Sequence, residues 1–296
     1  LAFSTDTGDV IAKDRASNEV LWRTDPWSKS RVASLASRDW LFGYATGDLV
    51  KSLAFSPDGS RVAVGGQNQE VVLIDATSGD VIRRLPASEY GWVNGVSFAE
   101  DGTLITANDD GRAVLWDIES GEPLWEYRLV DKLEKGSALT DWEEGVGRAE
   151  ISPDGTRLAA TTVGFGEGFS AQLFVYDLAT RAPAWRTTVD RWSAVFDWSP
   201  DSATVATGGS QSGDLTLWDA KEGGRLGEPV HASAGFLQTV SFAQDGSLIV
   251  TAGTDGTVRL YDSATLKQVG ANLPAIKSHT TFAFPLPDHR SLLALS

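Results

Sequence analysis

A recurring aspartate constrains the fold of this 296-residue chain more than any other sequence feature. Each aspartate follows an apolar segment, and successive ones are 61, 42, 60, 42 and 43 residues apart: Asp14, Asp75, Asp117, Asp177, Asp219 and Asp262. A near-constant step of about 42 residues is typical of an architecture built from repeated units of a few strands each. The two longer steps indicate that extra segments are inserted between repeats.

A second series of aspartates predicts tight turns within each repeat: Asp58, Asp101, Asp154, Asp201, Asp245 and Asp288. In Ser56-Pro57-Asp58-Gly59, proline presets φ, aspartate accepts backbone hydrogen bonds, and glycine permits a positive φ. Short segments that alternate apolar and polar residues, such as 52–55, precede these turns, and apolar segments such as 61–64 follow them. No segment keeps a helical period over three turns, so we expect an all-β protein with units of four antiparallel strands.

Two of these repeats resemble WD-repeat β-propellers. Asp110-Gly111 is followed by Trp116-Asp117, and Asp255-Gly256 is followed by Tyr261-Asp262, so that each turn aspartate lies six positions before its aromatic residue. The resemblance covers essentially the whole chain and implies β-propeller blades. It also implies a blade-stabilising network that links a turn Asp, a Ser or Thr, a Trp and a loop His.

The resemblance assigns a structural role to Asp110, Trp116, Asp255 and Tyr261, and to Trp218 as a strand anchor. The loop histidine is missing from almost every repeat, and His231 is the nearest candidate.

We interpret residues 1–296 as a single β-propeller of seven four-stranded blades, with six blades as the alternative. Residues 27–47 read as a reduced blade or an insertion, and 131–147 and 163–170 read as loop insertions. Strands at 10–14 and 20–23 would join strands at 280–284 and 292–295 in one composite blade, which removes open sheet edges. The chain opens on Leu1 and has no Met, so we expect a fragment or a processed form.

Composition and charge argue against several classes of function. The chain has no Cys and only three His, which are not at metal-ligand spacing, so we expect no disulfide, no metal and no cofactor. The net charge of −15 would repel phosphate backbones, so it disfavours a nucleic acid and indicates a basic partner or simply solubility. No apolar run is long enough to cross a membrane and no signal peptide is visible, so we expect no membrane partner and a cytoplasmic location.

Aromatic residues at one end of the predicted blades are the candidate binding site. Successive repeats place residues at the mouth of the central channel, and four of them are candidate contacts: Trp92, Trp192, Phe236 and His279. The two loop insertions would emerge on the same face and add Trp142, Glu143, Glu144, Phe165 and Phe169. The structural alternatives are that Trp92 and Trp192 plug the channel and that the loop aromatics fold back onto their blade.

Three functions remain open at this point. The first is a non-catalytic platform that binds a protein or peptide, including other domains of the same parent chain. The second is a sensor domain, because segments 269–274 and 227–230 resemble C-terminal propellers of actinobacterial STAND-type, ATP-dependent signalling regulators. The third is a propeller enzyme, for which we find no cluster of His or carboxylates. The fourth strands, such as 20–23 with Trp22, also resemble quinoprotein-like propellers, without residues placed for a quinone or its metal.

Overall fold

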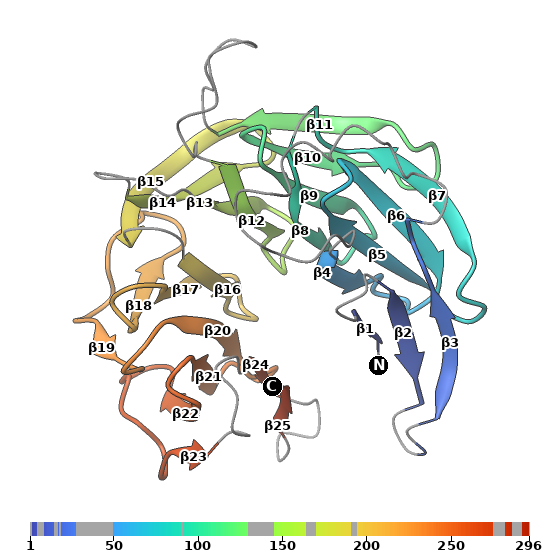
Figure 1. Ribbon diagram of the computed structural model, residues 1–296. Helices are drawn as coiled ribbons and strands as arrows, with labels where there is room; N and C mark the ends of the chain where they lie inside the picture. Colours follow the sequence, from blue (N-terminus) through green and yellow to red (C-terminus); the bar gives the residue numbers. More distant parts are fainter. Residues whose placement is uncertain are drawn as a thin grey trace, which may run out of the picture. The chain divides into compact units, whose positions relative to one another are not determined.

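The computed structural model describes residues 2–4, 9–14, 17, 19–27, 50–89, 91–129, 145–163, 170–190, 194–274, 282–285 and 292–295. Within these residues the chain contains strands and turns and no helix, which confirms the all-β prediction (Figure 1). The strand ladders are antiparallel, and several sheets have four strands. In the described part of the chain there is accordingly no helix that could cross a membrane.

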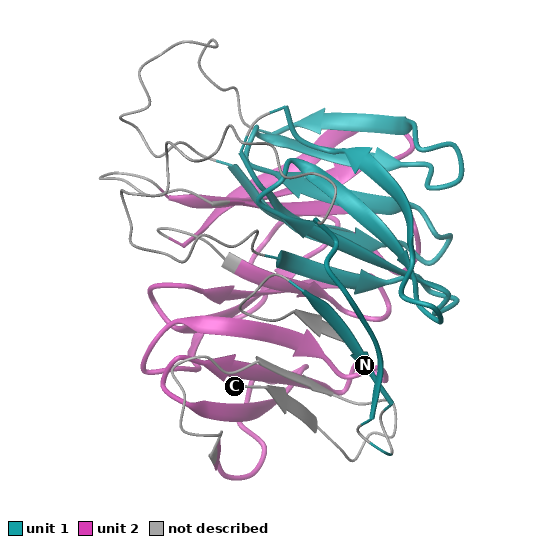
Figure 2. Ribbon diagram, turned by 45° about the vertical axis from the view of Figure 1, so that its right-hand side comes forward, with its two compact units in different colours: residues 1–132, 145–150 teal, residues 133–144, 151–296 magenta. Residues whose placement is uncertain are grey.

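The chain divides into two compact units (Figure 2), and the first comprises residues 1–132 and 145–150. Its first sheet has the order β1-β2-β3, and the next two sheets run in chain order from β4 to β7 and from β8 to β11. The strands are β1 (Ala2–Ser4), β2 (Val10–Lys13), β3 (Val20–Thr24), β4 (Val50–Phe55), β5 (Arg61–Gly66), β6 (Glu70–Asp75), β7 (Val81–Pro86), β8 (Val93–Phe98), β9 (Leu104–Asn108), β10 (Arg112–Trp116) and β11 (Pro123–Arg128). All but the last residue of β12 (Gly145–Ile151) also belong to this unit.

The second unit comprises residues 133–144 and 151–296. Ladders join β13 to β14 and β14 to β15, and two four-stranded sheets follow, from β16 to β19 and from β20 to β23. The strands are β13 (Arg157–Val163), β14 (Ala171–Asp177), β15 (Ala182–Asp190), β16 (Ala194–Trp198), β17 (Thr204–Gly209), β18 (Asp214–Asp219), β19 (Val230–His231), β20 (Leu237–Phe242), β21 (Leu248–Gly253), β22 (Thr257–Asp262), β23 (Leu273–Pro274), β24 (Phe282–Pro285) and β25 (Leu292–Leu295).

Both aspartate series act as predicted, by capping turns. Asp58 Oδ1 accepts a hydrogen bond of 3.0 Å from the N–H of Ser60, two residues further on. The same contact recurs at Asp101, Asp154, Asp201 and Asp245. Each aspartate of the first series accepts from a backbone N–H two or three residues ahead: Asp14, Asp75, Asp117, Asp177, Asp219 and Asp262. This repeated turn chemistry sets where each strand ends. Asp288 lies outside the described residues.

The hydrophobic core is a series of apolar layers between successive sheets. Leu73 and Leu85 of one sheet pack with Val96 and Leu104 of the next in the first unit. The second unit repeats this arrangement with Leu215 and Leu217 against Leu237, Val240 and Ile249. Burial of each such side chain stabilises the fold by about 1.5–3 kcal/mol, so packing between sheets holds each unit together.

One residue on the fourth strand docks a sheet onto the turn of the next sheet. Trp22 on β3 donates from Nε1 to Ala76 O at 2.8 Å, and its ring lies against Gly79. Trp185 on β15 repeats this contact with Ala220 O at 2.9 Å. Arg83 on β7 takes the same role and donates to Glu119 O at 2.9 Å and Ser120 O at 3.1 Å. Each docking residue lies eight positions after a strand-closing aspartate.

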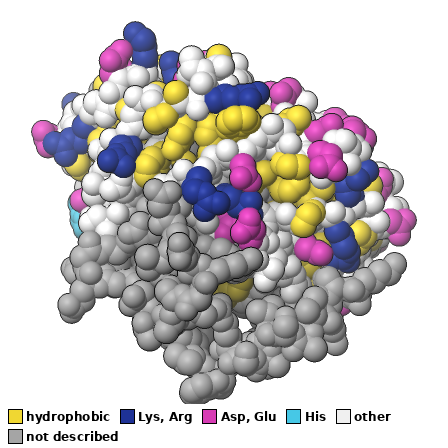
Figure 3. Space-filling view, turned by 90° about the horizontal axis from the view of Figure 1, so that it is seen from above, with side chains coloured by type: hydrophobic (Ala, Val, Ile, Leu, Met, Phe, Trp, Pro, Cys, Tyr) yellow, Lys and Arg dark blue, Asp and Glu magenta, His cyan; other side chains and the backbone are white. Residues whose placement is uncertain are grey.

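A β-bulge just before the docking residue explains a set of exposed apolar side chains. In four sheets the register shifts at the start of the fourth strand, and one residue is left without a partner opposite: Leu21, Ile82, Leu124 and Ala184. The first three are exposed. Figure 3 shows exposed apolar side chains lying among lysines and arginines on one face. Because a bulge twists an edge strand and re-aims the next side chain, it both protects the edge and turns the docking residue inward.

The two sheets with a glycine at the docking position have the shortest fourth strands. Gly227 and Gly270 stand eight residues after Asp219 and Asp262, and β19 and β23 have only two residues each. A glycine has no side chain with which to dock, so these fourth strands pair with the third strand over a shorter length.

The ends of the chain differ in part from the prediction. The predicted strands at 10–14 and 20–23 correspond to β2 and β3, but sequence reasoning missed β1, which pairs with β2 through Phe3 and Ile11. The predicted C-terminal strands correspond to β24 and β25, which form a two-stranded sheet. Most of the predicted reduced blade and loop insertions, namely 28–47, 131–144 and 164–169, lie outside the described residues.

Candidate functional site

Two of the predicted binding residues lie in the described part of the chain, Trp92 and Phe236. The other seven lie outside it: Trp142, Glu143, Glu144, Phe165, Phe169, Trp192 and His279. The geometry of the site is therefore built from the surroundings of Trp92 in the first unit and of Phe236 in the second.

Trp92 immediately precedes β8 and is held by the loop between β9 and β10. Its N–H donates to Asp109 Oδ2 at 3.0 Å, and its carbonyl accepts from the N–H of Asp109 at 2.9 Å. Two hydrogen bonds to one residue fix the backbone, and the side chain is 36% exposed. A fixed backbone with an exposed indole is the arrangement of a preorganised contact residue.

Phe236 occupies the equivalent position before β20. Its N–H donates to Thr254 Oγ1 at 2.9 Å, and its carbonyl accepts from the N–H of Thr254 at 2.9 Å. The ring is 45% exposed. The same two-bond clamp therefore presents an aromatic side chain in two sheets, with Asp109 and Thr254 as its side-chain acceptors.

A lysine and an asparagine flank Trp92. Lys51 is the second residue of β4, and its Nζ lies 4.3 Å from the centroid of the Trp92 ring, within the range of a cation–π contact. Asn94 on β8 donates from Nδ2 to Asp109 Oδ1 at 2.6 Å and to Val146 O at 3.0 Å. Partial desolvation by surrounding protein atoms lowers the pKa of Lys51, and the nearby Asp109 carboxylate opposes this effect.

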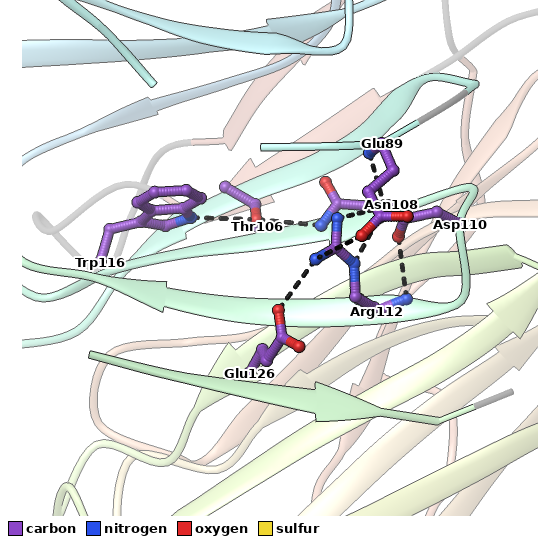
Figure 4. Close-up of polar contacts among 7 residues, drawn as sticks. All are labelled: Glu89, Thr106, Asn108, Asp110, Arg112, Trp116 and Glu126. Carbon is purple, nitrogen blue, oxygen red and sulfur yellow. Dashed lines mark hydrogen bonds and ion pairs between the residues drawn. The ribbon is translucent and has the colours of Figure 1, made fainter. Parts of the chain in front are cut away.

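Asp110, the residue after Asp109, is the centre of a polar network (Figure 4). Its Oδ2 accepts from the Glu89 N–H at 2.9 Å and from Arg112 Nη2 at 2.6 Å, and Arg112 Nη1 reaches Glu126 Oε2 at 2.8 Å. Because Asp110 is almost completely buried, these charge-assisted bonds compensate for its lost hydration.

Asp255, the residue after Thr254, repeats this network in the second unit. Its Oδ2 accepts from the Ala234 N–H at 3.0 Å and from Arg259 Nη2 at 2.9 Å. Its Oδ1 accepts from the hydroxyl of Thr257 at 2.7 Å. Burial alone would raise the pKa of Asp255, but these hydrogen bonds outweigh it and lower the pKa to about 2.

Two tryptophans anchor their third strands through the second strand. Trp116 Nε1 donates to Thr106 Oγ1 at 3.2 Å, and Trp218 Nε1 donates to Thr207 Oγ1 at 2.8 Å. Tyr261, the corresponding residue of β22, is buried. These contacts give Trp116 and Trp218 a structural setting distinct from that of exposed Trp92.

Sequence reasoning missed the arginines that complete the two aspartate networks. Arg112 and Arg259 follow Asp110 and Asp255 by two and four residues. Each aspartate lies in the turn just before the strand that carries its arginine, so the short separation in sequence was the available signal. The nearest candidate for a loop histidine, His231, is exposed on β19 and pairs with Asp214 Oδ1 at 3.1 Å.

One pocket of about 410 Å³ lies in the first unit, and its lining does not include Trp92. Its carboxylates are Asp58, Glu100, Asp101, Asp117 and Glu119, with Arg61 bound to Glu119 at 2.7 Å. Asp58, Asp101 and Asp117 already cap turns. Across the described ranges, no group of three or more His or acidic side chains has the geometry of a metal site.

Comparison with protein families gives matches over three parts of the chain. Residues 1–94 match a model described as the anaphase-promoting complex subunit 4 WD40 domain. Residues 228–262 match one described as WD domain, G-beta repeat. Residues 67–141 match one described as outer membrane protein assembly factor BamB.

Curated relatives agree with the first two matches. Eukaryotic translation initiation factor 3 subunit I of Drosophila willistoni is 28% identical over 199 residues, which cover 64% of this chain and 57% of the relative. The same subunit of Pyricularia oryzae is 26% identical over 74% of this chain and 64% of the relative. Guanine nucleotide-binding protein subunit beta of Arabidopsis thaliana is 24% identical over 76% of this chain and 48% of the relative. Parts of the chain are thus similar to WD40-repeat models and to these curated proteins.

The comparisons extend only to this similarity with WD40-repeat models. The chain spans about half to two-thirds of the length of these relatives. The resemblance to C-terminal propellers of actinobacterial STAND-type regulators is not shown by them, since the relatives named above are eukaryotic.

Proposed function

We propose that this WD40-repeat chain is a non-catalytic scaffold that binds a protein or peptide through the predicted channel-mouth face, to which the sequence assigns Trp92 and Phe236. The observation that carries the proposal is the repeated clamp, in which two backbone hydrogen bonds hold an exposed aromatic residue at equivalent positions of two sheets. Exposed aromatic side chains on rigid backbone are the usual anchors of protein interfaces.

The names of the relatives support this proposal independently. Both the translation initiation factor 3 protein and the guanine nucleotide-binding protein are named as subunits, that is, as components of multi-protein assemblies. The net charge of −15 favours a partner without net negative charge and disfavours nucleic acid. We further propose a cytoplasmic location and include the loop residues Trp142, Glu143, Glu144, Phe165 and Phe169, with Trp192 and His279, in the contact surface.

The finer description of the fold is part of the same proposal. We propose seven blades, with the two ends of the chain joined in one composite blade. An experimental density map would test the count directly, and a ring of six blades would require residues 27–47 to be an insertion.

Peptide selection provides the test of the binding face. Peptides selected from a random phage-displayed library on the wild-type protein are synthesised, and their affinities are measured by fluorescence anisotropy. Trp92→Ala, alone and combined with Trp192→Ala, is expected to weaken binding at least tenfold because interface tryptophans contribute about 2 kcal/mol or more.

The matched control is Trp125→Ala. Trp125 on β11 has nearly the same exposure as Trp92, but it has no part in the aromatic clamps. The assignment of the face fails if Trp92→Ala leaves affinity unchanged, or if Trp125→Ala weakens binding equally while thermal unfolding shows both variants folded.

A further inference from the structure

Lys51 lies in a β-bulge that aims its side chain toward the neighbouring sheet. Val50 pairs with Gly66 and Ser52 pairs with Gly65, so Lys51 has no residue opposite it on β5. Bulges commonly occur next to functional sites because they re-aim a side chain that would otherwise follow the pleat. Here the ammonium group lies 4.3 Å from the centroid of the Trp92 ring.

The equivalent bulge in the next sheet is occupied by Asn94. Val93 pairs with Asn108 and Gly95 pairs with Ala107, which leaves Asn94 as the extra residue. Its amide is used within the protein, because Nδ2 donates to Asp109 Oδ1 and to Val146 O. The two bulges are equivalent, but their side chains differ. Asn94 hydrogen-bonds within the protein, whereas Lys51 contacts the face of the Trp92 ring.

The charge of Lys51 is not neutralised by a direct ion pair within the described part of the chain. The carboxylate that influences it most, Asp109, receives hydrogen bonds from the Trp92 N–H and from Asn94. Lys51 is exposed, and the crowding that lowers its pKa leaves the ammonium incompletely hydrated. A carboxylate placed beside it would restore a charged partner and would also lie at the edge of an exposed indole.

We propose that Lys51 and Trp92 together bind a single Asp or Glu side chain of the partner peptide, with an adjacent apolar residue of the peptide covering the indole. This inference rests on the proposed function and specifies the chemistry of its partner. Because the chain has a net charge of −15, a strongly acidic peptide would be repelled at long range. The expected ligand therefore carries one carboxylate within a segment that is neutral or basic overall.

The test uses the peptides selected from the random phage-displayed library. Most peptides are expected to contain one Asp or Glu next to an apolar residue. Replacing that residue by Asn or Gln is expected to weaken binding to the wild-type protein at least tenfold, and to have no effect on binding to Lys51→Gln. Lys221→Gln removes an exposed lysine charge that pairs with Glu222 at 3.2 Å and is expected to leave all affinities unchanged.

A second readout reports on the lysine itself. NMR titration of the Lys51 ε-methylene signal is expected to give a higher pKa in the peptide complex, since a carboxylate favours the charged ammonium. Selection on Lys51→Glu is expected to yield peptides with Lys or Arg where wild-type peptides carry Asp or Glu.

The outcomes separate this inference from the proposed function. If Trp92→Ala weakens binding and Lys51→Gln does not, the scaffold proposal holds and the carboxylate assignment is wrong. If neither variant weakens binding, the binding face itself is misassigned. Lys51-dependent binding of a phosphoserine peptide, with no binding of carboxylate peptides, would also overturn the inference.

Discussion

At the scale of single residues, Asp110 and Asp255 each form a polar network with an arginine where the family resemblance implied a histidine. Asp110 and Asp255 each bond to a backbone N–H from a residue 21 positions earlier and to an arginine on the following strand. The guanidinium supplies several donors at once and stays charged at all relevant pH values, so it can replace an imidazole in holding a buried carboxylate.

Asp255→Asn should reveal this interaction in acid. The folded-state pKa of Asp255 is about 2, below its ordinary value of 3.8. A depressed folded pKa contributes stability that is complete above the unfolded value and is lost as the pH falls through the folded value. We expect Asp255→Asn to lower the free energy of unfolding by on the order of 2 kcal/mol at pH 7.

Urea unfolding at pH 7 and pH 3 checks this expectation. The difference between wild type and Asp255→Asn should shrink at pH 3, where the aspartate has lost part of its contribution. Asp80→Asn, at an exposed turn carboxylate, is the control and should change little at either pH. An equal loss at both pH values would show that the destabilisation does not come from the ionised carboxylate.

At the scale of elements, the docking of each fourth strand depends on a pair of positions. The residue eight positions after a strand-closing aspartate contacts the next sheet. In that sheet it packs against the residue four positions after the strand-closing aspartate. Trp22 meets Gly79, Arg83 meets Gly121, and Trp185 meets Gly223. Glycine at the receiving position allows the ring or guanidinium to lie directly on the backbone of the turn.

Gly79→Ala and Gly59→Ala separate this docking from backbone strain. Both glycines have a positive φ, but a Cβ at position 79 would lie 2.8 Å from the Trp22 ring, whereas a Cβ at position 59 meets nothing within 4 Å. Gly59→Ala should cost roughly 1–2 kcal/mol from the left-handed conformation alone. Gly79→Ala should cost about 1–3 kcal/mol more, because it also overpacks the docking contact.

The comparison is made by urea or thermal unfolding of both variants. Equal losses would mean that the Trp22 ring moves aside without cost and that the docking contact adds little to stability. A double variant, Gly79→Ala with Trp22→Leu, should recover part of the difference if the steric contact with the indole causes it.

These elements also show how far the sequence predicts the structure. The two aspartate series predicted the strands and turns because turn chemistry is local, and local chemistry is readable from neighbouring residues. Two features could not be predicted in this way: which residue packs against Trp22, and that Arg112 takes the position expected for a histidine. Both depend on contacts that short-range sequence patterns do not show. The cation–π contact of Lys51 with Trp92 was missed for the same reason, since it follows from a bulge in one sheet and a loop of another.

At the scale of the whole molecule, charge is the property that acts on every part of the chain. The chain has 40 acidic and 25 basic residues. Hydrogen bonds in the turns lower the pKa of many aspartates and keep them ionised, including Asp75, Asp117 and Asp262. A net charge of this size keeps a protein soluble but repels itself in the compact state. The same net charge would repel an acidic partner, which is why we propose a neutral or basic ligand segment.

Salt should therefore stabilise this protein at neutral pH. Raising NaCl from about 0.01 M to about 0.1 M shortens the screening length from about 30 Å to about 10 Å, which weakens repulsion across the molecule. Exposed ion pairs such as Arg61–Glu119 contribute only about 0–1 kcal/mol each, so their weakening should not offset this gain. We expect the thermal midpoint to rise by about 2 °C or more at pH 7.

The matching experiment is calorimetry at pH 4.6, the isoelectric point expected from the sequence. With no net charge to screen, the salt effect should vanish or reverse there, because only the favourable ion pairs remain to be weakened. A midpoint that rises equally with salt at both pH values would assign the effect to salt acting on apolar surface instead. The folded charge distribution would then not limit stability. The proposal that net charge disfavours acidic partners would lose its physical basis.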